Sequence, residues 1–429
     1  MSKPDFLSIP LAYGKASFSV SFPGGRTDLI EPRHAPGLPD ERRAFKDALA
    51  APIDAPPLRE WIKPDSRVCI VFTDITRATP NDRIIPWLLE ELAGHPRELV
   101  TLVNGLGTHR PNTPAELEAM LTAAVVRGWR VVNHEPENPA ALTAVGRLDS
   151  GRPALINRLV AEADVRILTG FIEPHFFAGF SGGPKAILPG TAGLDSVMDN
   201  HGASPIAHPG AAFGLTKGNP IWEEMARVAA AVGPSFLINV TLNERRQITG
   251  VYAGELFAAH RAGCEAVKAS AMRAVDREYE VVVTTNSGYP LDLNLYQGVK
   301  GLSAGARIVK PGGLLILACE CREGVPAGSP FDRLLRSAAE PEAVLHTIGA
   351  PGFRAPEQWQ AQILALIRRR ARVHLFSSLT DEAVRAAHME PCRDIAAAVA
   401  QELAGRGAEA RVAVLPQGPL TIPYLDRAV

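Results

Sequence analysis

Residues 67–80, RVCIVFTDITRATP, contain an apolar run that leads directly into a polar loop. The run 67–72 is rich in β-branched residues and predicts a buried parallel strand. A helix is expected over 81–93, so Asp74 and Arg77 fall on the loop at the carboxyl end of the strand. Ligand sites in open α/β sheets lie at this end. An Asp-Thr capping arrangement with a surface arginine would explain the same residues equally well.

The next segment repeats this order of elements. A strand is expected over 98–103, and the loop 104–110, NGLGTHR, follows it. The residues 113–116 then open a helix, with threonine at the N-cap, proline at N1 and glutamate at N3. His109 therefore lies on a loop equivalent to the one that carries Asp74. A lone loop histidine is usually just solvated, but this position favours a functional role.

The same alternation of strands and helices continues to the end of the chain. In the first part we expect strands within 8–22 and at 129–133, 165–168, 235–242 and 248–252, with helices at 41–49, 154–162, 221–232 and 255–275. In the second part we expect strands at 279–285, 314–318, 373–376 and 411–415, with helices from 294 and at 356–370 and 394–404. The pattern predicts an α/β fold with two domains, 1–275 and 276–429, each a mostly parallel sheet flanked by helices.

Composition narrows the class of protein. The 429 residues suit two domains, and 46% hydrophobic and 21% charged residues are ordinary for a globular chain. A net charge of −1 gives no reason to expect nucleic acid or a membrane surface as a partner. We expect no signal peptide and no membrane span. Five cysteines, few and odd in number, favour reduced thiols and a cytoplasmic location.

The segment 171–201, FIEPHFFAGFSGGPKAILPGTAGLDSVMDNH, concentrates reactive side chains after the strand 165–168. It holds His175, Lys185 and His201, together with five glycines and several phenylalanines. Apolar surroundings would lower the pKa of the lysine and make it a nucleophile. Two kinds of chemistry stay open on residue types alone. One is a lysine joined covalently to a cofactor or a carbonyl, and the other is a metal site that uses some of the three histidines.

Several separated segments resemble the nickel-dependent lactate racemase family. They are Asp74-Ile75-Thr76-Arg77, Gly107-Thr108-His109-Arg110, Glu173-Pro174-His175-Phe176-Phe177-Ala178-Gly179, Ser181-Gly182-Gly183-Pro184-Lys185, Asn200-His201 and Gln297-Gly298-Val299-Lys300. Their order follows the family from about residue 8 to near the C-terminus, and the central segment is highly specific. Many members have a histidine where this chain has Ile75, which would alter the cofactor pocket.

The resemblance implies a nickel-pincer nucleotide, a pyridinium-3,5-dithiocarboxylic-acid-type mononucleotide linked covalently to a lysine that matches Lys185. The nickel ligand from the protein matches His201, and the glycines would leave room for the tethered ring. Contacts to the cofactor match Asp74, Ile75, Thr76 and Arg77. The acid/base pair matches His109 and His175. Substrate-binding residues match Arg77, Gln297 and Lys300, which would place the active site in the interdomain cleft. Trp359 is a looser match to a tryptophan near the site.

The activity implied is racemisation or epimerisation of a lactate-like 2-hydroxy acid. Hydride would pass from the α-carbon to the cofactor, and a 2-keto acid would be the intermediate. Proteins that synthesise the cofactor are then expected as partners. A metal-assisted hydrolase or lyase that uses the three histidines without a tethered cofactor is the alternative enzyme. A non-catalytic nucleotide-binding or metal-binding protein is the third possibility, and the presence of both acid/base histidines argues against it.

Overall fold

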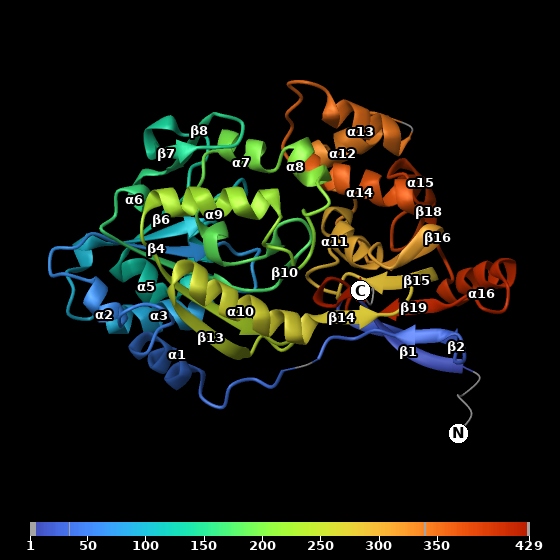
Figure 1. Cartoon of the computed structure of the whole chain (residues 1–429), viewed down its shortest axis with the longest axis horizontal. Coiled ribbons are helices and arrows are strands. Elements are labelled where there is room, and N and C mark those ends of the chain that lie inside the picture. The colour runs from blue at the N-terminus through green and yellow to red at the C-terminus, as the bar shows by residue number, and fades with distance from the viewer. Residues whose placement is uncertain (1–5, 34, 339, 427–429) are drawn as a thin grey trace. The chain divides into compact units, whose positions relative to one another are not determined.

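Two compact units make up the residues that the computed structural model describes, which are 6–33, 35–338 and 340–426 (Figure 1). The N-terminal unit comprises 35–201 and 208–270. The C-terminal unit comprises 6–33, 202–207 and 271–426. Each has a mostly parallel sheet flanked by helices, which confirms the predicted fold class.

The bounds of these units differ from the predicted division after residue 275. The N-terminal unit ends at Ser270, five residues before the predicted division. The described residues before 34, however, belong to the C-terminal unit. The reason is strand pairing, because β3 (Thr27–Leu29) lies parallel to β19 (Val412–Leu415). Nothing in the local sequence of so short a strand reveals a partner almost 400 residues away.

A six-stranded sheet forms the centre of the N-terminal unit. Its order is β13 (Ile248–Glu255), β12 (Phe236–Leu242), β9 (Val165–Phe171), β4 (Val68–Thr73), β5 (Val100–Gly105) and β6 (Arg130–Asn133). The strands from β12 to β6 pair in parallel, and β13 pairs antiparallel with β12, as predicted for 235–242 and 248–252. The loops after β4, β5 and β9 therefore leave the same edge of the sheet.

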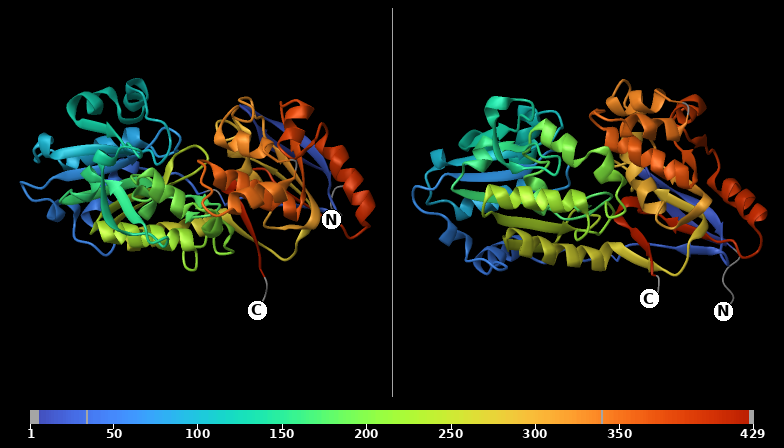
Figure 2. Two further views of the ribbon diagram at one scale, coloured as in Figure 1. Left: turned by 90° about the horizontal axis from the view of Figure 1, so that it is seen from above. Right: turned by 45° about the horizontal axis from the view of Figure 1, so that its top comes forward.

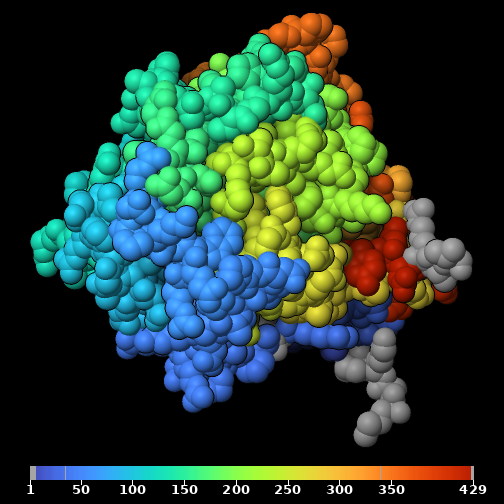
Figure 3. Space-filling view, turned by 60° about the vertical axis from the view of Figure 1, so that its left-hand side comes forward, coloured from blue at the N-terminus to red at the C-terminus, as the bar shows by residue number. Residues whose placement is uncertain are grey.

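Alternate residues of each strand face opposite sides of this sheet. Val68, Ile70 and Phe72 of β4 pack on one side against α1 (Glu41–Ala50), α3 (Asn81–Glu91), α4 (Pro114–Leu121) and α5 (Ala123–Gly128). The remaining helices of the unit are α2 (Leu58–Trp61), α6 (Arg158–Ala161), α7 (Leu194–Asn200), α9 (Pro220–Val232) and α10 (Leu256–Ala271). Figure 3 shows the blue segment around α1 lying against the yellow β13–α10 segment, consistent with the bridge between Ile53 and Gly254.

Two predicted helices are partly wrong. Residues 154–157 belong to strand β8 (Pro153–Asn157), which pairs with β7 (Leu142–Arg147), and only the following turn is helical as α6. The helix predicted to reach 275 ends at Ala271, and β14 (Met272–Val275) then pairs with β20 (Ile422–Leu425). In both places strand pairing, with the preceding strand β7 and with the C-terminal strand β20 respectively, overrides the local preference for helix.

The C-terminal unit has a second six-stranded sheet, which is parallel throughout. Its order is β18 (Glu390–Pro391), β17 (Arg372–Phe376), β16 (Val309–Ala318), β15 (Tyr279–Thr285), β19 and β3. One face packs against the hairpin of β1 (Phe6–Tyr13) and β2 (Ala16–Pro23) and against α16 (Ile395–Arg406) (Figure 2). The other helices are α8 (Ala203–Ala207), α11 (Leu295–Gly305), α12 (Pro330–Arg336), α13 (Pro341–Gly349), α14 (Gln358–Arg370) and α15 (Asp381–Ala386).

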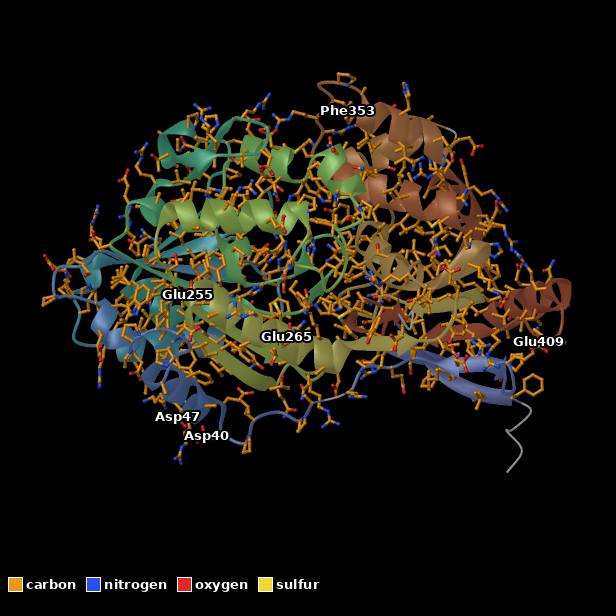
Figure 4. All side chains as sticks on the ribbon, viewed as in Figure 1. Asp40, Asp47, Glu255, Glu265, Phe353 and Glu409 are labelled. Carbon is orange, nitrogen blue, oxygen red and sulfur yellow. The ribbon has the colours of Figure 1, made fainter. Side chains whose placement is uncertain are left out.

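Side-chain caps define several helix starts. Asp40, labelled in Figure 4, accepts the Arg43 N–H at the start of α1. Glu255, also labelled, accepts the N–H groups of Phe257 and Ala258 at the start of α10. Within the described ranges, no helix combines the length and the apolar character that crossing a bilayer requires.

The predicted capping box at the start of α4 is confirmed. Thr113 Oγ1 accepts the Glu116 N–H at 3.3 Å, and Glu116 Oε2 accepts the Thr113 N–H at 2.8 Å. Glu116 also accepts hydrogen bonds from Arg110 and Asn112. The cap therefore holds the loop that carries His109 as well as the helix.

Replacing Thr113 by alanine should lower the free energy of unfolding by about 1 kcal/mol, because one N–H in the first turn loses its acceptor. Thr113→Ser keeps the hydroxyl and should stay close to the wild type. Urea unfolding followed by circular dichroism measures both variants. Equal losses for alanine and serine would show that the methyl group, and not the cap, is responsible.

Candidate active site

The loops after β4 and β5 bring Asp74 and His109 into contact, as their shared sheet edge predicts. His109 Nδ1 lies 2.8 Å from Asp74 Oδ2. Thr76 Oγ1 donates to the same carboxylate at 3.0 Å, and Arg77 Nε lies 3.7 Å from it. The Asp74 side chain is 3% exposed, whereas that of His109 is 39% exposed. A buried carboxylate thus anchors a histidine that reaches solvent.

The charge on Asp74 follows from its neighbours. Burial alone would raise the pKa of this carboxyl, but the hydrogen bond from His109 and the charge of Arg77 outweigh burial and lower the pKa below its usual value. Asp74 is therefore a carboxylate at neutral pH and can only accept hydrogen bonds. His109 must donate from Nδ1, so in the neutral ring Nε2 is the basic nitrogen.

His175 has the opposite arrangement of its ring nitrogens. It lies on β10 (Pro174–His175), which pairs with β11 (Gly179–Phe180) in a tight hairpin. The Ala178 N–H donates to His175 Nδ1 at 3.2 Å. The neutral ring of His175 therefore carries its proton on Nε2. The two predicted acid/base histidines differ in tautomer, which no sequence pattern indicated.

The ring of Phe177 gathers three of the predicted site residues around it. Its centroid lies 4.5 Å from that of His175 and 4.9 Å from that of His201, both edge to face. Lys185 Nζ lies 5.8 Å from the same centroid, within cation–π range. His175, Lys185 and His201 therefore share one neighbourhood, as their place in the segment 171–201 predicted.

His201 is held as a neutral ring. It follows directly after α7 and is 5% exposed. Burial first, and the positive charge of Lys185 second, lower the pKa of His201 to about 3. A histidine that stays neutral throughout the physiological range is unsuited to proton transfer. It retains a lone pair at every working pH, which is the property a metal ligand needs.

Lys185 lies on a short 3-10 helix, Gly183–Ala186, that follows the turn Ser181-Gly182-Gly183. This helix contacts β4, β9 and α9, so the sheet itself supports it. The buried His260 of α10 lies against the turn, and its Nε2 is 2.9 Å from the Ser181 carbonyl oxygen. Burial lowers the pKa of His260 to about 4, so the neutral ring donates this bond.

The structure gives the glycines of this segment a different explanation from the one the sequence suggested. Gly179, Gly182 and Gly183 all have positive φ. A Cβ at these positions would approach the Leu215 carbonyl oxygen to 2.1 Å, Asn239 Oδ1 to 2.3 Å and the His260 ring to 2.5 Å, respectively. The chain packs on itself at these three glycines, which explains them without a tethered ring; that they leave room for one stays a prediction.

The other predicted site residues divide between the two units. Ile75, next to Asp74, is 42% exposed. Gln297 and Lys300 lie in the C-terminal unit on one face of α11, and both are half-buried. Trp359, in the same unit, is 8% exposed and donates from Nε1 to the Tyr296 hydroxyl at 3.2 Å.

Three contributors to the site are not predicted by the sequence pattern. The pattern predicts Phe177 only as an apolar neighbour of the reactive residues, and it gives no role to His260 and Glu224. Glu224 of α9 accepts a hydrogen bond from Asn200, which in turn contacts His201. Both His260 and Glu224 lie on long amphipathic helices, where a single buried polar residue gives no local signal.

Gly183→Ala should destabilise the protein more than Gly151→Ala. Both glycines have positive φ, +55° and +81°, but a Cβ at Gly151 meets nothing within 4 Å. The backbone penalty of about 1–2 kcal/mol should be common to both. The clash with His260 should add about 1–3 kcal/mol at Gly183. Thermal and urea unfolding measure the difference, and equal losses would mean that the turn moves away from His260 without cost.

The chain is similar to known proteins over most of its length. The family model described as the lactate racemase N-terminal domain matches residues 13–214, and that of the lactate racemase C-terminal domain matches residues 275–422. The lactate racemase of Thermoanaerobacterium thermosaccharolyticum is 34% identical over 96% of this chain and 98% of its own length. The lactate racemase of Lactiplantibacillus plantarum is 36% identical over 88% of this chain and 90% of its own.

A solved structure extends the comparison to the fold. The lactate racemase apoprotein from T. thermosaccharolyticum matches with a TM-score of 0.91 at 33% identity, over 97% of this chain and all of that one. A structure of a Thermotoga maritima protein, 20% identical, matches with a TM-score of 0.68 and shows a shared fold alone. Taken with the two family models and the relatives that match over most of their length, this places the chain in the lactate racemase family of isomerases.

Proposed function

We propose that this protein racemises or epimerises a 2-hydroxy acid, with lactate as the first substrate to test. The family supports the reaction type, because the relatives are named lactate racemases. The observation that carries the proposal is the environment of Phe177, around which Lys185, His175 and His201 gather, the last with a pKa lowered by burial and by Lys185. A covalent anchor, an acid/base group and a metal ligand are the three parts that the proposed mechanism uses.

The residues present fit a lysine-tethered nickel-pincer nucleotide of the pyridinium-3,5-dithiocarboxylic-acid type. We propose Lys185 as its covalent anchor, His201 as the protein ligand to nickel, and Asp74, Ile75, Thr76 and Arg77 as further contacts to it. When bound, this group supplies an acceptor for the hydride of the substrate α-carbon. A single buried imidazole suits a metal whose other ligands come from the cofactor.

The acid/base work falls to His109 and His175. His109 presents a basic Nε2, and Asp74 stabilises the imidazolium that forms when the ring takes the hydroxyl proton of the substrate. A charged His175 would have to give up the hydrogen bond from Ala178, so the two histidines differ as bases. Loss of the hydroxyl proton and the α-hydride leaves a planar 2-keto acid, whose carbonyl carbon can take hydride back on the opposite face while its oxygen takes back a proton.

Substrate binding is assigned to Arg77, Gln297 and Lys300. A guanidinium can bind a carboxylate with two parallel hydrogen bonds, and an ammonium adds a compact positive charge.

Proteins that synthesise the cofactor are proposed as partners. We also propose a cytoplasmic location, which the five buried, unpaired cysteines support.

The alternative enzyme, a hydrolase or lyase with metal held by histidines alone, receives less support. Among the residues that the structure describes, no three His, Cys, Asp or Glu side chains are grouped so as to hold a metal ion. His201 lies beside the positive charge of Lys185, which also disfavours a cation held there by protein ligands without a compensating anion.

A chiral assay with cofactor-loaded protein tests the reaction directly. Protein produced together with the cofactor-synthesis proteins should interconvert the enantiomers of lactate or of a related 2-hydroxy acid. Intact mass should show an added nucleotide on the wild type and on Lys217→Ala, whose lysine is exposed. Lys185→Ala should lack both the added mass and the activity. An active Lys185→Ala protein without added mass would refute the tethered cofactor.

Asp74→Asn should lower kcat by about 10²–10⁴-fold, because His109 loses the carboxylate that fixes its tautomer and stabilises its charge. Glu118→Gln, which changes an exposed carboxylate on α4 outside the proposed site, is the control and should keep the wild-type kcat. Intact mass must be measured alongside, since Asp74 is also proposed to contact the cofactor. A fall in kcat that only mirrors a loss of the nucleotide would argue against the role of Asp74 toward His109.

A further inference from the structure

A chain of buried hydrogen bonds leads from α9 to the ring of His201. Asn200, the last residue of α7, is 1% exposed, and Glu224 is 4% exposed. Asn200 Nδ2 donates to Glu224 Oε2 at 2.8 Å and to the Ile221 carbonyl oxygen at 3.1 Å. Asn200 Oδ1 then lies 3.0 Å from His201 Nδ1. All four residues belong to the N-terminal unit.

The chemistry of these groups allows one orientation of the amide. A carbonyl oxygen can only accept, and Glu224 already accepts the Asp149 N–H at 2.6 Å through Oε1. Reversing the Asn200 amide would turn its oxygen toward two other acceptors, which is unfavourable in a buried site. The amide oxygen must therefore face His201, and His201 Nδ1 must be the donor.

Consequently the lone pair of the neutral His201 ring lies on Nε2. We propose that Asn200 and Glu224 are positioning residues that fix the tautomer and orientation of His201, so that Nε2 is the nitrogen presented to nickel. This inference rests on the proposed function for the identity of the metal. The hydrogen-bond argument itself depends only on the residues of this chain.

The position of Glu224 is itself secured from the other side. Arg227, one turn further along α9, forms an ion pair with Asp149, whose N–H Glu224 accepts. Asp149 lies in the turn between β7 and β8, and Ser150 of the same turn donates to Asp199 of α7 at 2.6 Å. The turn therefore links α9 to the C-terminal end of α7, which His201 directly follows.

A purely structural role, joining α7 to α9, would predict lower stability without any change at His201. Nitrogen NMR of the full-length protein labelled with ¹⁵N-histidine separates the two roles. The His201 signals are identified by their loss in His201→Gln. In the wild type we expect His201 to be protonated at Nδ1 and unprotonated at Nε2. A wild-type ring with its proton on Nε2 would overturn the proposal.

Glu224→Gln should release this constraint, because Asn200 and Asp149 donate to different carboxylate oxygens and glutamine replaces one of these by an NH2 donor. A measurable fraction of His201 should then carry its proton on Nε2. Glu223→Gln on the same helix is exposed and should match the wild type. The double variant Asn200→Asp/Glu224→Gln restores an acceptor facing His201 and should return the proton to Nδ1. Identical spectra for the wild type and Glu224→Gln would contradict the role of Glu224.

Nickel retention gives a second readout on the cofactor-loaded protein. After dialysis against a chelator, Glu224→Gln should keep the mass added at Lys185 but hold nickel about 10–100-fold less tightly than the wild type and Glu223→Gln. Retention equal to the wild type would count against the proposal. If the wild type carries no added mass, the proposed function fails, while the NMR result still decides the role of Asn200 and Glu224.

Discussion

The parallel pairing of β4 with both β5 and β9 is the constraint on which the arrangement of the site depends. Val71 is paired with Val103 on one side and with Leu168 on the other, so the three strands end together. The loops that follow these strands therefore lie next to one another. Asp74 and His109 come into contact for this reason, and the Gly107 N–H reaches the Gly190 carbonyl oxygen of the third loop.

Three histidines of the N-terminal unit acquire distinct chemistry from three kinds of partner. His109 faces a carboxylate, His175 accepts a backbone N–H, and His201 faces an amide oxygen. A carboxylate stabilises the charged form of the ring. A backbone N–H disfavours the charged form, because the nitrogen that accepts it cannot be protonated at the same time. A neutral amide oxygen fixes the tautomer without adding charge. The division of work among identical side chains therefore depends on their second contacts.

Much of the fold could be predicted because strand and helix patterns alternate clearly, and the capping box at Thr113 and Glu116 was visible in four residues. Asp74 and His109 could be placed on one edge by topology alone. Their direct contact, and the tautomer of His175, depend on side-chain positions within an ångström, which no pattern encodes. The strand at 154–157 is predicted as helix because Ala and Leu favour helix locally, but its pairing with β7 across the turn 148–152 outweighs that preference. Glu224 and His260 could not be predicted as site residues, because single polar residues on apolar helix faces have no distinctive sequence pattern.

The pairing of β3 with β19 has a consequence for synthesis of the chain. The sheet of the C-terminal unit lacks its edge contact until Val412 to Leu415 have left the ribosome. Every strand of the other sheet has been synthesised once residue 255 has been added to the chain. At synthesis rates of about 5–20 residues per second, the interval between the synthesis of β13 and that of β19 is on the order of ten seconds. During that time the nascent chain can already hold a folded segment with Lys185 and His201, while the N-terminal hairpin still waits for its partner strands.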